Sequence, residues 1–198
     1  VFSRSAPIIQ LPRGATENDH LELLAVLNSS VACFWLKQVS HNKGEGGGAR
    51  VEAGYSAMGS EEWKNAYEFT GSKIQKYPLP EKLPLSRGIA MQALVQQLAG
   101  ASPSRLEKES VITRELIARR RNSWQSVRRR MIAEQEELDW EVYSLYGLLD
   151  EELTAPAEFV PELRLGERAF EIVLARKMER GEVQTEWFKR HGRHGSTP

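Results

Sequence analysis

The chain has 198 residues, of which 40% are hydrophobic, with 27 basic and 27 acidic side chains and one cysteine. This length suits one domain, or a small domain with an appendage, and the apolar fraction suffices for a buried core, which excludes wholesale disorder. The lone Cys33 excludes a disulfide framework or cysteine-rich zinc module and fits the reducing cytoplasm. The most apolar stretch, residues 21–36, is shorter than a membrane span of roughly 20 residues, so we expect a soluble protein with no membrane partner.

The first part of the chain is predicted to form a small mixed lobe. Residues 1–16 contain two prolines and predict an extended arm, and apolar side chains at helical spacing predict one largely buried helix over residues 20–37. Residues 40–59 include six glycines and predict a long loop, of the kind that is often functional. A helical turn over residues 61–67 and a strand over residues 71–80, ended by prolines, complete the lobe.

Helices are predicted to dominate from residue 85 onward. An amphipathic helix over residues 89–98 ends near Gly100, and a capping box formed by Ser104 and Glu107 begins the next helix. That helix is predicted to run without Gly or Pro from residue 105 to 146, about 60 Å if unbroken. Its apolar side chains repeat every seven residues and predict an antiparallel pairing with the preceding helix. The repeat consists of Ile117, Trp124, Met131, Leu138 and Leu145, flanked by Val127 and Val142.

A short amphipathic helix is predicted near the C-terminus, over residues 167–180. Gly181 follows it as a stop, and residues 190–198 are predicted to be a loose tail. Its predicted buried face consists of Phe170, Val173, Leu174 and Met178. The whole pattern predicts an α+β fold dominated by helices, with a small mixed lobe (1–84), a long helical hairpin (85–150) and a C-terminal helical segment (151–198).

The chain contains two opposed blocks of charge. Residues 101–130 carry 9 basic and 3 acidic side chains, whereas residues 131–163 carry 10 acidic side chains and no basic one. Such blocks favour complementary faces within one chain or between partners, and the simpler alternative is a solvated helix whose charges pair with their neighbours. The arginines at 119–121 and 128–130 suit either phosphate binding or pairing with the acids at 134–141 of another segment.

Catalytic or metal chemistry has little support in the sequence. Cys33 and His41 could be a nucleophile and a base, but Cys33 lies on an apolar stripe, where a buried inert thiol is usual. His191 and His194 have the spacing of metal ligands, but no cysteine or acid accompanies them in the tail. A third set could be a carboxylate pair or metal site, but is more typical of a solvated face: Glu134, Glu136, Glu137 and Asp139.

The glycine-rich loop has more than one interpretation. It lacks the Lys-Ser/Thr ending of a nucleotide P-loop and follows a helix, so it is either a flexible connector or a basic loop that approaches a polyanion. His41, Lys43 and Arg50 supply the basic character, and Asn42 is a chemical type suited to reading adenine. Four aromatic residues could stack on bases but are more typical of a core: Trp63, Tyr67, Phe69 and Tyr77.

Several stretches resemble the C-terminal region of a known family. They are LLAVLNSSVACFWLKQ, a glycine-rich loop and YEFTGSKIQKYPLP, followed by AEQEELDWEVYSLYGL and LGERAFEIVLARKMERGEVQTEWFKRHG. This text is similar to the target-recognition region of single-chain adenine-N6 DNA methyltransferases from restriction–modification systems. Within them, it most resembles the PglX-like methyltransferases of BREX phage-defence systems. The resemblance covers nearly the whole chain.

The resemblance implies a cytoplasmic DNA-binding specificity fragment rather than a complete enzyme. In this family another domain of the same chain binds S-adenosylmethionine and carries an Asn-Pro-Pro-Tyr type motif, and neither is present here, so we expect no catalytic residue, cofactor or metal site in this segment. The implied partners are double-stranded DNA, the N-terminal methyltransferase domain of a parent chain, and other subunits of a defence complex. The expected DNA contacts are His41, Asn42, Lys43, Arg50, Lys73 and Lys76. The alternative is a helical module that docks a partner subunit and has no DNA affinity.

Overall fold

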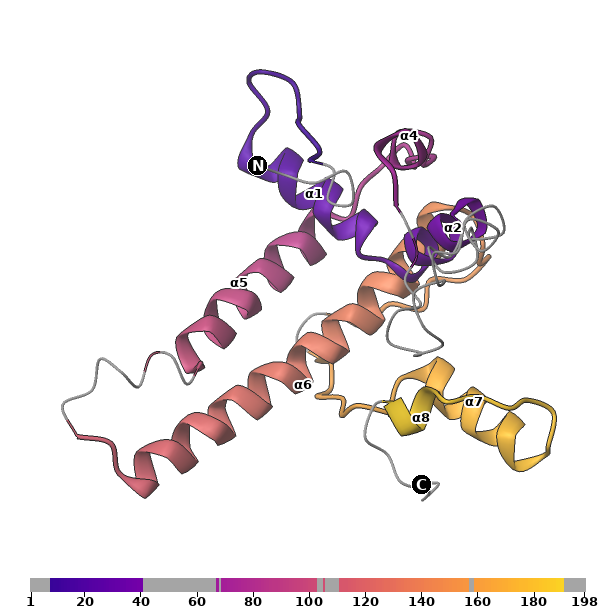
Figure 1. Cartoon of the computed structure of the whole chain (residues 1–198). Coiled ribbons are helices and arrows are strands. Elements are labelled where there is room, and N and C mark those ends of the chain that lie inside the picture. The colour runs from indigo at the N-terminus through magenta and orange to yellow at the C-terminus, as the bar shows by residue number, and fades with distance from the viewer. Residues whose placement is uncertain are drawn as a thin grey trace, which may run out of the picture. The chain divides into compact units, whose positions relative to one another are not determined.

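The computed structural model describes residues 8–40, 67, 69–102, 105, 111–156 and 159–190. The chain divides into two compact units, Val1–Leu83 and Pro84–Pro198. The first contains α1 (Glu17–Leu27), α2 (Ser30–Val39) and α4 (Gly71–Ile74), and the second contains α5 (Leu85–Ala101), α6 (Arg114–Leu145), α7 (Ala169–Glu179) and α8 (Trp187–Arg190) (Figure 1). Among these helices, none combines the length and the apolar character needed to cross a membrane.

The predicted α+β class is wrong. Every regular element in the described part of the chain is helical, and the strand expected over residues 71–80 begins instead with α4. Ile74 N donates to Thr70 O at 3.1 Å and Gln75 N to Gly71 O at 2.9 Å, so this turn satisfies backbone groups that a lone strand would leave without partners. Ile74 and Tyr77 are three residues apart, and a helical turn places both on one side of the segment.

The single helix predicted near the N-terminus is in fact two helices, separated at Asn28 and Ser29. The buried Ser29 Oγ donates to Val26 O at 2.7 Å and accepts a hydrogen bond from Ala32 N at 3.2 Å. Asn28 Nδ2 also donates to a carbonyl in the last turn of α1, at 2.8 Å. One hydroxyl therefore serves the end of α1 and the start of α2, because short polar side chains compete for backbone groups.

α1 begins with a capping box that involves Thr16 and Asp19. The N–H and the hydroxyl of Thr16 donate to Asp19 Oδ2 at 2.6 and 2.8 Å, and Asp19 N donates to Thr16 Oγ1 at 3.3 Å. The pKa of the Asp19 carboxyl is held below its ordinary value mainly by the hydrogen bond from the Thr16 backbone N–H and, second, by that from the Thr16 hydroxyl.

α5 and α6 pack together as the antiparallel hairpin of the second unit (Figure 1). α6 has 32 residues, about 48 Å of helix, and it begins at Arg114 rather than at residue 105. Thr113 caps it by accepting a hydrogen bond from Leu116 N at 3.1 Å. The expected capping box at Ser104 and Glu107 lies outside the described residues.

The seven-residue seam of α6 is buried toward its C-terminal end and exposed toward its N-terminal end. Leu138 and Val142 are 2% and 0% exposed and Val127 is buried, as is Leu94 on α5. In contrast, Ile117 is 47% exposed, although it belongs to the same repeat. The hydrophobic core of this unit therefore runs along α6 from Val127 toward its C-terminal end, and the first turns of the helix, around Ile117, are exposed.

α7 confirms the predicted C-terminal helix but not its predicted buried face. Gly181 follows the helix with a φ of +71°, a left-handed conformation suited to glycine. Phe170, Val173 and Met178 are 41%, 51% and 36% exposed. The buried side chain of this helix is Glu171, whose carboxylate accepts hydrogen bonds from Arg168 N at 3.2 Å and Trp187 Nε1 at 2.9 Å.

Candidate nucleic-acid interface

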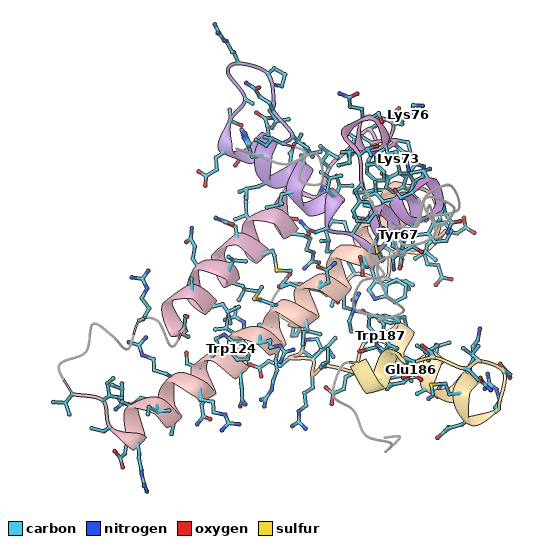
Figure 2. The ribbon with its side chains drawn as sticks, in the orientation of Figure 1. Tyr67, Lys73, Lys76, Trp124, Glu186 and Trp187 are labelled. Atoms are coloured by element: carbon cyan, nitrogen blue, oxygen red, sulfur yellow. The ribbon has the colours of Figure 1, made fainter. Side chains whose placement is uncertain are left out.

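Two of the predicted DNA contacts, Lys73 and Lys76, lie on and just after α4 (Figure 2). Lys76 is exposed and Lys73 is half-buried. Lys76 N donates to Lys73 O at 3.0 Å, so the turn continues to Lys76 and brings the two residues to one side of the segment. The other predicted contacts, His41, Asn42, Lys43 and Arg50, lie outside the described residues, as does the glycine-rich loop that contains them.

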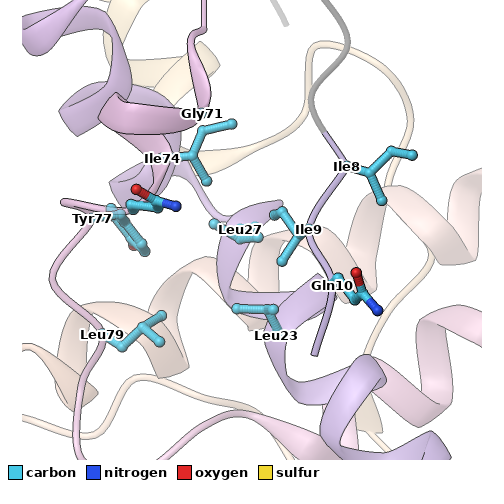
Figure 3. A pocket seen from close by; sticks show the side chains of 10 residues that line it. Ile8, Ile9, Gln10, Leu23, Leu27, Gly71, Ile74, Tyr77 and Leu79 are labelled. Carbon is cyan, nitrogen blue, oxygen red and sulfur yellow. The ribbon is translucent and has the colours of Figure 1, made fainter. Parts of the chain in front are cut away.

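A cavity of about 300 Å³ lies beneath α4 in the first unit (Figure 3). Its wall is apolar apart from two glutamines: Ile8, Ile9, Gln10, Leu23, Leu27, Gly71, Ile74, Gln75, Tyr77 and Leu79. Tyr77 is buried and meets Trp35 edge-on, with ring centroids 5.4 Å apart. The segment with the two lysines is thus held against α2 by the contact of Tyr77 with Trp35.

The aromatic residues of this unit divide into buried and exposed rings. Tyr77 confirms the expectation of a core position, whereas Tyr67 is 44% exposed. Tyr67 stacks on Phe69 with ring centroids 6.2 Å apart, and Lys37 Nζ lies 6.0 Å from the Tyr67 centroid. Proteins that bind single-stranded nucleic acids combine aromatic rings with nearby cations, and the free face of Tyr67 beside Lys37 has this chemistry. Trp63 lies outside the described residues.

Cys33 does not have the buried environment predicted for it. The thiol is exposed on α2, and the neighbouring Phe34 is 66% exposed, so this helix is not largely buried. The partner considered for Cys33, His41, lies outside the described residues, as do His191 and His194. Among the residues that the structure describes, no cluster of His, Cys, Asp or Glu has the arrangement of a metal site.

The acids of α6 form a buried ionic network rather than a solvated face. We call Glu134, Glu136, Glu137, Asp139 and Glu141 the acidic segment. Arg87 of α5 lies 3.1 Å from Glu134, 3.6 Å from Glu137 and 3.2 Å from Glu141. Glu137 Oε2 also accepts a hydrogen bond from Ala155 N at 2.6 Å. Arg87 therefore offsets part of the negative charge on one side of the acidic segment and ties α5 to α6.

Arg168 contacts the other side of the acidic segment. Its Nε lies 2.7 Å from Glu136 Oε2, its Nη2 contacts Asp139 Oδ2, and Ala169 N donates to Glu136 Oε1 at 3.0 Å. Burial of the guanidinium lowers its pKa, but the hydrogen bonds and negative charges of Glu136 and Asp139 more than offset this, so the pKa of Arg168 is raised. The start of α7 is thereby fixed to α6. Sequence reasoning missed this role because Arg87 and Arg168 lie far from the acids in the chain.

The arginine-rich half of α6 has a different environment. Arg114, Arg119, Arg121, Arg128 and Arg130 are exposed. Arg120 Nη1 donates to Gly100 O at 2.8 Å, Arg129 lies 3.8 Å from Glu162, and the Arg128 guanidinium lies 5.4 Å from the Trp124 ring centroid (Figure 2). Within the described residues, the acidic segment contacts Arg87 and Arg168 and makes no ion pair with the arginines of residues 119–121 or 128–130.

Comparison with known proteins identifies the kind of protein to which this segment is similar. The chain is 49% identical to the adenine-specific methyltransferase PglX of Streptomyces coelicolor over 201 aligned residues, which cover 100% of this chain and 16% of the relative. The resemblance to PglX-type methyltransferases is confirmed. A family model described as "Domain of unknown function (DUF7008)" matches residues 131–198. No solved structure matches the chain.

The chain thus spans about a sixth of the length of the PglX relative. The family model covers the acidic half of α6, Arg168, α7 and α8, and so contains the Arg168 part of the ionic network but not Arg87. The match to PglX extends over both units, including the lysines of α4 and the arginines of α6.

Proposed function

We propose that the chain is the DNA target-recognition fragment of an S-adenosylmethionine-dependent adenine-N6 DNA methyltransferase in a phage-defence or restriction–modification system. The observation that carries this proposal is the 49% identity to PglX across the whole chain. An enzyme that acts on N6 of adenine must take the base out of the stack, so its recognition part has to hold the duplex while the base is flipped. That task requires phosphate contacts for position and base contacts for specificity.

The first unit has residues suited to both tasks. Lys73 and Lys76 are positioned by an anchored helical turn, and the exposed Tyr67 lies beside Lys37. In the proposal, Lys43 and Arg50 join the two lysines on phosphates, helped by His41, while Asn42 and nearby polar groups reach base edges. The methyltransferase domain of the parent, duplex DNA and other defence subunits are the proposed partners, in the cytoplasm.

S-adenosylmethionine enters this proposal only through the rest of the parent protein. When bound there, it supplies the methyl group. The cavity beneath α4 does not fit this cofactor, because its lining contains no Asp or Glu to accept hydrogen bonds from ribose hydroxyls. We therefore assign no cofactor contact and no methyl-transfer step to the described residues.

Salt-dependent binding to duplex DNA tests the proposal. We expect the chain to bind duplexes with an affinity that falls as salt rises, and Lys73→Ala/Lys76→Ala to weaken all sequences alike and lower the salt slope by about 0.9 per lost contact. Fluorescence anisotropy with a labelled duplex at several salt concentrations measures both. Arg13→Ala/Lys82→Ala is the matched control, since both residues are exposed and lie in the same unit.

The proposal fails if the unsubstituted 198-residue chain has no affinity for duplex DNA even at low salt. If the unsubstituted chain binds duplexes but Lys73→Ala/Lys76→Ala has the same affinity and salt slope as Arg13→Ala/Lys82→Ala, the assignment of Lys73 and Lys76 is wrong while the general proposal remains. A residue that reads a base behaves differently from a lysine on a phosphate. Its replacement should cost about 1–3 kcal/mol of binding free energy on the recognised sequence and relax specificity at that position.

One observation favours the second candidate function, a helical module that docks a partner subunit. α7 exposes Phe170, Val173 and Met178 on one side of the helix. An exposed apolar face of this kind is typical of a protein interface. This candidate becomes the better account if the chain has no affinity for duplex DNA, and both functions are compatible within one defence complex.

A further inference from the structure

α6 carries opposite charges on its two halves, and in the acidic half every carboxylate contacts an arginine from another segment. Residues 114–130 contain seven arginines and a single acid, Glu115, whereas residues 131–145 contain five acids and no basic residue. The acids are paired with Arg87 and Arg168. All five carboxylates already contact Arg87 or Arg168, which makes them less available to the arginines of the same helix or of a second copy.

Three of the arginines form a straight row along the exposed part of the helix. We call Arg114, Arg121 and Arg128 the arginine row. They are seven residues apart, which is close to two turns, so they share one face and follow each other at intervals of about 10.5 Å. All three are exposed.

The arginine row has no ionic partner within the part of the chain that the structure describes. Within the described residues, the ion pair of this half joins Arg129 to Glu162 at 3.8 Å and does not involve the row. Arg128 lies 5.4 Å over the ring of Trp124, a stacking contact that orients the guanidinium while leaving its N–H groups available for hydrogen bonds.

We infer that the arginine row is a phosphate-binding surface for the backbone of duplex DNA. This inference rests on the proposed function and adds to it a second contact region, in the other unit of the chain. Guanidinium groups donate paired hydrogen bonds that match phosphate oxygens. A rigid row about 21 Å long suits a continuous, regular polyanion, because each arginine can reach a different phosphate without the helix bending.

The row is expected to position the duplex without reading its sequence. The 17 residues of α5 pack against part of the 32-residue α6, which is therefore not free to enter a groove from every side. Contacts to the backbone alone add affinity that is the same for all sequences and is sensitive to salt. An acidic protein partner is the competing interpretation of the same arginines, and the test below separates the two.

The test compares Arg114→Gln/Arg121→Gln/Arg128→Gln with a control of equal charge loss. The control is Arg164→Gln/Arg176→Gln/Lys177→Gln, whose three residues are exposed and lie in the same unit. The full chain and both variants are titrated with a labelled duplex over a range of salt, after circular dichroism has confirmed equal helix content. We expect the row variant to lower the salt slope by about 2.7, from about 0.9 per lost contact, and the control to leave it unchanged.

Each outcome has one interpretation. If the unsubstituted chain binds no duplex, the proposed function fails and this inference fails with it. If the unsubstituted chain binds but the row variant keeps the same salt slope, this inference alone is wrong. If the row variant keeps its DNA affinity but loses binding to poly-glutamate, the row serves an acidic protein partner and the DNA assignment is overturned.

Discussion

At the scale of single residues, two arginines decide how the acidic segment is used. Arg87 contacts three carboxylates of α6 and Arg168 contacts two more. The four acids that sequence alone assigns to a solvated face are at most 15% exposed: Glu134, Glu136, Glu137 and Asp139. A buried ion pair adds little net stability compared with apolar packing, but losing one partner strands a charge. We therefore expect the network to affect stability mainly when one of its members is removed, because the remaining charge is then buried without a partner.

Replacement of Arg168 should destabilise the second unit strongly. Arg168→Met leaves Glu136 and Asp139, 11% and 4% exposed, without their cation, and we expect a loss of about 3–5 kcal/mol in the free energy of unfolding. Urea denaturation followed by circular dichroism measures it. Arg164→Met, at an exposed position four residues earlier, should cost less than about 0.5 kcal/mol. Similar losses for the two variants would contradict the network.

How much of this could be read from the sequence depends on the distance between partners. The cap at Ser29 lies within the text NSS, where a polar interruption of an apolar run is visible, yet the apolar spacing favoured one helix. Arg87 and Arg168 are separated from their acids by about 30 to 50 positions, and no local pattern links them. Burial of charge thus depends on tertiary pairing, which helix periodicity alone does not determine.

At the scale of elements, α7 illustrates the limit of amphipathic pattern. The spacing of Phe170, Val173 and Met178 predicted the helix and its end at Gly181 but assigned the wrong face to the interior. The buried position belongs to Glu171, because Trp187 and the backbone N–H of Arg168 donate to its carboxylate. The strand expected over residues 71–80 failed for a related reason: two apolar side chains three residues apart fit a helical turn as well as a strand end.

The same substitution at two valines tests these burial assignments. Val142 on α6 is 0% exposed and Val173 on α7 is 51% exposed. We expect Val142→Ala to lower the free energy of unfolding by about 1–3 kcal/mol, since it removes buried methyl groups and leaves a small cavity. Val173→Ala should change it by less than about 0.5 kcal/mol. Chemical denaturation of both variants measures the pair, and an equal or larger loss for Val173→Ala would show that α7 buries its apolar face.

At the scale of the whole molecule, a resemblance in the sequence predicted the relationship to PglX-type methyltransferases, which the spacing of apolar residues does not indicate. The similarity to PglX-type methyltransferases extends over the full chain at 49% identity, while no solved structure matches it. The helical hairpin of the second unit was visible in the spacing of apolar residues, but the exposed arginine half of α6 emerged only when the acids were found to be paired elsewhere. The two proposed contact regions, around α4 and along α6, belong to different units.

Selection from a pool of randomised duplexes tests the central claim most directly. The full chain is immobilised, the pool is applied at moderate salt, and the retained duplexes are sequenced. A target-recognition fragment should enrich one short sequence that contains an adenine, because base contacts add about 1–3 kcal/mol of discrimination each to the uniform phosphate term. Retention without an enriched sequence, or no retention at all, would contradict the assignment of target recognition to this chain.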